Sequence, residues 1–148
     1  MNDAFGKVVA ILLCAYLMFI APVSYMIKET ENTTQTYILN EITVFVEEVK
    51  NTGILDKERY NILCEKIYAL SSYGSRYEID MIHSKHGYDE DGKEIIFDID
   101  NYYKNDILKI LSISDCYYMN EADYFKMTVY KGGIPICFYG GGIKNEAY

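Results

Sequence analysis

Few side chains in this sequence could carry out acid–base or metal chemistry. The only histidines are His83 and His86, which lie three residues apart. On a helix this spacing suits a shared metal ion, but we expect the pair to leave a strand and enter a turn. A zinc site would also need a third ligand from a distant carboxylate or cysteine. We therefore expect two surface histidines that hold no metal.

A cluster of acidic residues follows the histidines. Carboxylate oxygens are the ligands that calcium prefers, but their spacing here does not match the D-x-[DN]-x-[DN]-G of an EF-hand loop. We expect a solvated turn in which Asp91-Gly92 is a hairpin signal, and calcium binding by residues 89–100 stays open. The cluster consists of Asp89, Asp91, Glu94, Asp98 and Asp100.

The four cysteines form no redox or zinc motif, because no C-x-x-C pair occurs among them. Cys14 lies in an apolar segment, so Cys64, Cys116 and Cys137 remain, and three cysteines allow at most one intrachain disulfide. No local signature pairs any of them with a histidine as nucleophile and base. Without such a pair, and without a phosphate-binding glycine loop, we expect neither catalysis nor a cofactor.

The rest of the chain is organised around one apolar segment. Residues 8–27 read VVAILLCAYLMFIAPVSYMI, twenty residues without a charge between Lys7 and Lys28. A helix of this length reaches about 30 Å, the thickness of the hydrocarbon core of a bilayer. A buried core helix is the alternative, but such helices seldom stay apolar on every face for so long. The segment therefore predicts a single transmembrane helix.

We expect this segment to stay as an anchor. It is longer than the apolar part of a signal peptide, and no small-x-small cleavage site follows it. The basic residues on its two sides give only a weak asymmetry. A short tail before the segment and a large domain after it favour a cell-membrane protein with N-in, C-out orientation. The predicted parts are a tail and anchor at residues 1–28 and an extracytoplasmic domain at residues 29–148.

The second part carries nearly all of the charge. The chain has 22 acidic and 14 basic residues, a net charge of −8, and all but one of the acids follow residue 28. An acidic surface without a basic patch repels phosphate backbones and anionic lipid headgroups. This composition excludes nucleic-acid binding.

Helical periodicity continues after the anchor, and residues 29–52 predict an amphipathic stalk helix that ends at Gly53. The polar run at its start contains neither glycine nor proline. The anchor helix therefore either continues through this run or ends before a new N-cap at Thr30 or Asn32. We expect the apolar stripe of the stalk to contact neighbouring chains, because a small sheet cannot cover it fully. The stripe consists of Ile38, Ile42, Phe45 and Val49.

The rest of the domain predicts a second helix and several strands. Asp56 is a candidate N-cap of the second helix. Residues 76–83 and 123–131 alternate apolar and polar side chains, as half-buried strands do. A returning strand at residues 95–99 and a short helix at residues 101–112 lie between them. These elements predict an α+β domain with an antiparallel sheet packed on helices.

The glycines at 132–133 predict a two-residue hairpin turn, because such a turn needs positive φ at both positions. The turn pairs Lys131 with Ile134. This pairing sets Val129 opposite Ile136 and Met127 opposite Phe138, with the apolar side chains on one face.

The same register turns Cys137 away from the apolar face, and Pro135 marks its strand as an edge. Cys64 lies on an apolar helix face. We therefore expect no Cys64–Cys137 disulfide, and Cys116 is the remaining partner for Cys137.

The order of tail, membrane helix, amphipathic extension and small α+β domain resembles pilin-like proteins. Residues 42–83, ITVFVEEVKNTGILDKERYNILCEKIYALSSYGSRYEIDMIH, are similar to TadE-like minor pilins of Gram-positive tight-adherence pilus systems, as are NDILKILSI and ADYFKMTV. One departure is that Ile11, and not Glu, follows Gly6 at the spacing of a prepilin-peptidase site.

The resemblance implies an accessory component of a tight-adherence or type IV-like pilus or secretion apparatus. Its partners would be other pilin-like subunits or pilus-assembly membrane proteins. The alternative is a membrane-tethered extracytoplasmic binding or sensor module unrelated to pili.

Overall fold

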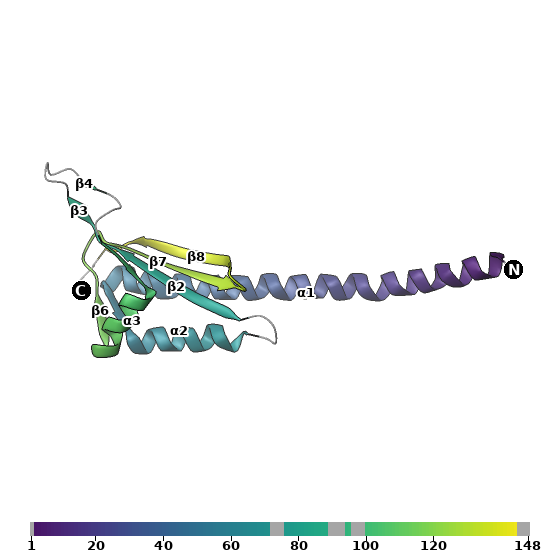
Figure 1. The fold of residues 1–148 in the computed structure, drawn as a ribbon, viewed down its shortest axis with the longest axis horizontal. Coiled ribbons are helices and arrows are strands. Elements are labelled where there is room, and N and C mark those ends of the chain that lie inside the picture. Colours follow the sequence, from purple (N-terminus) through teal and green to yellow (C-terminus); the bar gives the residue numbers. More distant parts are fainter. Residues whose placement is uncertain (1, 72–75, 89–93, 96–99, 145–148) are drawn as a thin grey trace. The chain divides into compact units, whose positions relative to one another are not determined.

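The computed structural model describes residues 2–71, 76–88, 94–95 and 100–144. The chain divides into two compact units, Met1–Thr36 and Tyr37–Tyr148. The boundary therefore falls later in the chain than the predicted one after Lys28. Figure 1 colours the first unit purple.

Helix α1 spans Asn2–Thr52. It is helical throughout the polar run, so the anchor helix continues and no new N-cap forms there. Threonine hydroxyls in the run donate instead to carbonyl oxygens four residues earlier, as Thr30 does to Met26 and Thr34 does to Thr30, both at 2.9 Å. Gly53 ends α1 with a φ of 68°, and its N–H donates to the Val49 carbonyl at 2.8 Å.

The domain has a four-stranded antiparallel sheet in the order β5-β2-β7-β8 and two small strand pairs, β1-β6 and β3-β4. In Figure 1 α2 and α3 lie on one side of β2, β7 and β8. The strands are β1 Ile54–Asp56, β2 Tyr77–Ser84, β3 Gly87–Tyr88, β4 Glu94–Ile95, β5 Asn101–Tyr103, β6 Cys116–Tyr118, β7 Tyr124–Lys131 and β8 Ile134–Gly142, and the further helices are α2 Lys57–Ala69 and α3 Lys104–Ile113.

One core joins the helices to the inner face of the sheet. Every second residue of β2 and β7 is buried, as the alternation predicts. The side chains of these strands meet the apolar faces of α1, α2 and α3 in a single cluster of buried residues. Asp56 caps α2 as predicted, because its carboxylate accepts from the Arg59 N–H at 3.0 Å. The α+β architecture predicted from the sequence is therefore present.

The β7–β8 turn forms as predicted, with φ of 58° and 80° at the glycines of 132–133. The predicted register is wrong beyond it. A β-bulge beside Tyr130 shifts the ladder, so Val129 pairs with Cys137 and not with Ile136. The shift lies next to Pro135, which has no N–H to donate to the ladder. As predicted, β8 is an edge strand.

The segment before α3 also differs from its prediction. Residues 101–103 form β5, which pairs with β2, and α3 begins only at Lys104. The predicted returning strand lies mostly outside the described residues, and β4 pairs with β3 and not with the main sheet. The expected Asp91-Gly92 turn is also outside the described residues.

Candidate functional site

The N-terminal part of α1 presents apolar side chains that are exposed in the structure. Every described side chain from Ala4 to Thr33 is exposed, including Met18 at 79% and Phe19 at 75%. Among the described residues, α1 is the one helix long and apolar enough to cross a membrane. An apolar surface of this size is unfavourable in water and is stable in an apolar environment such as a lipid bilayer. This part of the chain fits a single-pass membrane anchor.

The stripe predicted as an assembly face lies inside the domain. Ile38 and Ile42 have no exposed surface, and Phe45 and Val49 retain 7% and 2%. They pack in the core with residues of α2 and the sheet. This burial corrects the expectation that the stripe contacts neighbouring chains. The reason is that the four-stranded sheet, together with α2 and α3, buries the whole stripe in one core.

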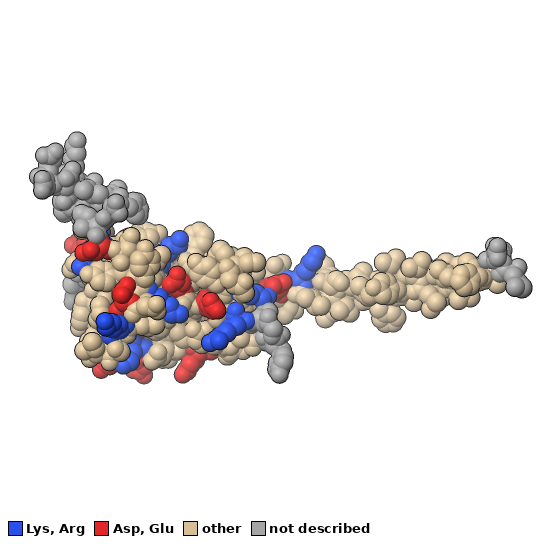
Figure 2. All heavy atoms as spheres, viewed as in Figure 1, with Lys and Arg blue, Asp and Glu red and all other residues tan. Residues whose placement is uncertain are grey.

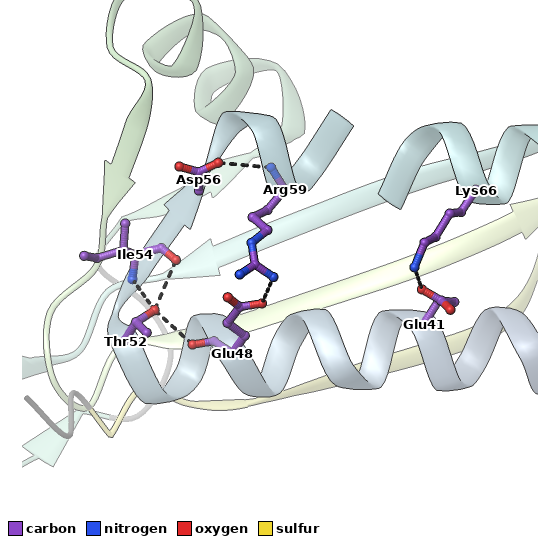
Figure 3. A network of polar contacts seen from close by, with 7 residues as sticks. All are labelled: Glu41, Glu48, Thr52, Ile54, Asp56, Arg59 and Lys66. Carbon is purple, nitrogen blue, oxygen red and sulfur yellow. Dashed lines mark hydrogen bonds and ion pairs between the residues drawn. The ribbon is translucent and has the colours of Figure 1, made fainter. Parts of the chain in front are cut away.

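A groove of about 460 Å³ lies between the end of α1 and the start of α2. Two ion pairs span these helices, as Figure 3 shows. Arg59 Nη1 lies 3.0 Å from Glu48 Oε2, and Lys66 Nζ lies 2.7 Å from Glu41 Oε2. Of these pairs, Arg59 and Glu48 line the groove. The rest of its lining is both apolar, with Ile62 44% exposed, and polar, and consists of Phe45, Val49, Ile54, Ile62, Thr52, Asp56 and Glu58. The groove offers apolar contact and paired charges, and it holds no nucleophile–base pair.

A wider hollow of about 790 Å³ lies beside β2, the end of α2 and the start of α3, and it is lined largely by tyrosines and charged residues. Lys104 Nζ donates to the Ile79 carbonyl at 2.6 Å and so is partly used in holding α3 to β2. The tyrosines are Tyr68, Tyr77, Tyr103 and Tyr130. Hydroxyl and charged groups of this kind suit contact with a polar ligand.

His83 is buried, so the prediction of two surface histidines is wrong for this residue. Its side chain is 1% exposed and lies between two other polar groups. Nδ1 lies 2.7 Å from the Tyr117 hydroxyl, and Nε2 lies 2.9 Å from Asp123 Oδ2. His83 continues the alternation of the buried residues in β2, and that pattern could have revealed it.

Asp123 is the second buried polar residue, and it is 2% exposed. Besides His83, its carboxylate accepts backbone N–H bonds from His86 and from Asn120, both at 2.8 Å. It stands two residues before Phe125 on the same face, so alternation would also have placed it inside. Its pairing with His83 could not be found this way, because 40 residues separate them.

Burial governs the ionisation of the core groups. It lowers the pKa of His83, although the nearby Asp123 carboxylate acts in the opposite direction. It raises the pKa of the Tyr117 hydroxyl well above its ordinary value. These shifts favour the uncharged forms of both side chains near neutral pH.

All four cysteines are free in the structure. The prediction that Cys137 points away from the apolar face is wrong, because the bulge turns its side chain toward the core. Burial raises its pKa to about 11, so the thiol stays protonated and unreactive at neutral pH. Cys116 Sγ lies 3.9 Å from an oxygen of Asp56.

Charge is spread over the domain in both signs. On the face shown in Figure 2, lysines, arginines and acids alternate over the second unit, and the apolar part of α1 carries almost none. Within the described ranges, no three His, Cys, Asp or Glu side chains come together to hold a metal ion. Most of the acidic cluster considered for calcium lies outside these ranges.

Comparisons with protein-family models, with curated proteins and with solved structures found no match to this chain.

Proposed function

We propose that this protein is a membrane-anchored, pilin-like accessory component of a tight-adherence or type IV-like pilus or secretion apparatus. It acts by association of its N-terminal helix with other helices in the membrane and performs no catalysis. The observation that supports this proposal best is the continuity of α1. One helix carries both the fully exposed apolar segment and the apolar stripe at the centre of the domain core.

The connection between the two parts argues against a simple tether. A module that only needs to stay near a membrane is commonly joined to its anchor by a flexible, glycine- or serine-rich linker. Here residues 29–36 are helical and contain neither glycine nor proline. An anchor that is part of the domain's own core helix is the arrangement that the resemblance to pilins implies.

The surface available for assembly is the apolar segment. Since Ile38, Ile42, Phe45 and Val49 are buried, partners contact the helix at residues 8–27. Van der Waals packing and small residues drive helix association in lipid, where apolar contact alone gives no advantage. The partners are other pilin-like subunits or pilus-assembly membrane proteins, with the domain on the extracytoplasmic side.

An exchange of the segment tests this proposal. Residues 8–27 are replaced by a Leu-Ala repeat of equal length, which inserts in the membrane but presents a different surface. We expect the exchanged chain to remain in the membrane fraction with a folded domain and to lose its co-purifying membrane partners. The matched control is the chain with its natural residues 8–27, produced and purified in the same way. Retention of all partners by the exchanged chain would contradict assembly through this helix.

The second candidate is a membrane-tethered binding or sensor module. The groove beside Arg59 and the tyrosine-lined hollow favour it, because concave surfaces with convergent polar groups suit ligands. The same exchange distinguishes the two functions. A tethered module keeps its ligand and its activity behind any inserting helix, whereas an assembly subunit does not.

A further inference from the structure

We propose that His83 and the side chains around it form an acid-sensitive latch, in which a proton taken up by His83 loosens the attachment of residues 117–123 to the rest of the domain. The His83 cluster consists of His83, Tyr117, Asp123, Tyr102 and Lys85. This inference does not depend on the proposed function, because it concerns the stability of the domain alone.

The hydrogen bonds of the cluster fit a neutral imidazole. Asp123 accepts two backbone N–H hydrogen bonds and lies within hydrogen-bond distance of His83 Nε2. A carboxylate only accepts, so it accepts from the imidazole as well. Nε2 of His83 therefore carries a hydrogen and donates it to Asp123. In the neutral ring Nδ1 then has no hydrogen, and it accepts one from the Tyr117 hydroxyl at 2.7 Å. Every polar atom of the ring is satisfied in this form.

Protonation of Nδ1, which turns the His83 ring into an imidazolium ion, is incompatible with these hydrogen bonds. Nδ1 would become a donor, so the Tyr117 oxygen would have to accept and its own hydrogen would need another acceptor. Among the described residues, His83 is the one hydrogen-bond partner of that hydroxyl, and Tyr117 is only 5% exposed. A buried donor without an acceptor destabilises the folded state. The geometry itself therefore opposes protonation.

The groups packed around the ring act in both directions. Tyr102 of β5 stacks on His83 with ring centroids 5.8 Å apart, and Lys85 Nζ lies 3.0 Å from the Tyr102 hydroxyl. Asp123 favours the imidazolium, whereas burial and the Lys85 charge oppose it, and burial is the largest effect. The remaining charged groups act through neighbours: Asp100 acts on Lys85, and Asp106 acts on Tyr117.

The sign of the pH dependence follows from this balance. The pKa of His83 is lower in the folded chain than its ordinary value of 6.5. Unfolding then takes up a proton below about pH 6.5, so the stability present above that pH is lost as the pH falls. Carboxylates titrate at lower pH, which leaves a window in which the histidines alone respond.

The latch connects separate parts of the domain. Tyr117 belongs to β6, whose partner β1 directly follows the end of α1. Asp123 holds the N–H of His86 at the end of β2 and the N–H of Asn120 before β7. Opening the cluster removes these side-chain hydrogen bonds. Among the described residues, the β1–β6 pairing and backbone hydrogen bonds with Gly53 and Ile143 still hold residues 117–123, whereas the longer β2–β7 and β7–β8 ladders keep their full set.

Thermal unfolding of the full chain in detergent micelles, from about pH 7.5 to about pH 5, tests the latch. We expect the unfolding equilibrium constant to rise up to about tenfold per pH unit below pH 6.5. Amide hydrogen exchange, corrected for its intrinsic pH dependence, should rise first at residues 117–123 and later at residues 125–131. His83→Gln should remove the acid dependence. His86→Gln, which changes the other histidine, should keep it.

NMR titration of the two histidine rings in the wild-type chain provides an independent result if His83→Gln does not fold. We expect the His83 ring to stay neutral until residues 117–123 open. The latch is wrong if the His83 ring titrates at or above pH 6.5 while the domain stays folded. It is also wrong if His86→Gln abolishes the acid dependence, or if exchange rises uniformly over the domain.

Discussion

The two units of this chain use apolar residues in opposite ways. In Met1–Thr36 apolar side chains surround the helix and stay exposed, whereas in Tyr37–Tyr148 they form a stripe that is buried in the domain. A helix that is apolar on all sides needs a lipid or a large protein core around it, and a striped helix needs only one packed face. The same helix α1 therefore changes its surroundings at the boundary between the units.

The largest difference between the two units should come from an aspartate substitution in each of them. Ile42→Asp puts a charge without a partner into the core, which costs several kcal/mol and should unfold the domain. Leu13→Asp, at an exposed position, should leave the domain folded and weaken membrane insertion by about 2.5–3.5 kcal/mol. Circular dichroism in detergent and membrane flotation measure the two effects. A folded domain in Ile42→Asp would show that the stripe is not core.

The second-largest difference should lie within the second unit. There, loss of a buried polar contact should lower the free energy of unfolding more than loss of an exposed one. Asp123→Ala removes the acceptor of the buried His83 ring and of two part-buried backbone N–H groups. We expect the lost His83 bond alone to lower the free energy of unfolding by about 1.5–3 kcal/mol, and the two backbone bonds to add to this loss. Glu48→Ala breaks the exposed pair with Arg59 and should cost about 0–1 kcal/mol. Denaturant unfolding of the full chain in micelles measures both. Equal losses would mean that the His83 cluster contributes no more than a surface pair.

The smallest difference in stability should come from adding one methyl group at a glycine in each unit. A Cβ at Gly140 would lie 2.8 Å from the Phe125 carbonyl oxygen and 2.9 Å from the Lys126 Cβ. Gly140→Ala should therefore separate β8 from β7 locally and cost about 1–3 kcal/mol. Gly6→Ala is the matched control, because nothing lies within 4 Å of its added Cβ. Thermal unfolding compares them, and an unchanged midpoint for Gly140→Ala would contradict the β7–β8 register.

Local patterns predicted the elements that depend on local rules. Alternation located β2 and β7, positive φ located the turn at 132–133, and Asp56 and Gly53 marked helix ends. Each of these signals arises within a few residues of the feature that it predicts.

Features that depend on distant partners could not be predicted in this way. Strands β1, β5 and β6 have three residues each, too few to show a period, and they form because they pair with remote strands. The bulge beside Tyr130 adds a residue that strict alternation does not reveal. The position of His83 could be foreseen from alternation, but not its contacts with Tyr117 and Asp123, because the fold brings them together.

Crosslinking from within the membrane tests the central proposal most directly. A photoreactive residue in place of Leu13, which is 56% exposed, reports what surrounds the apolar segment in the cells that produce the chain. If assembly occurs through this helix, we expect a crosslink to another membrane protein with a charge-free N-terminal helix. We expect this crosslink to disappear when the other residues of 8–27 are replaced by a Leu-Ala repeat. Crosslinks to lipid alone, in chains whose domain is folded and membrane-bound, would contradict it.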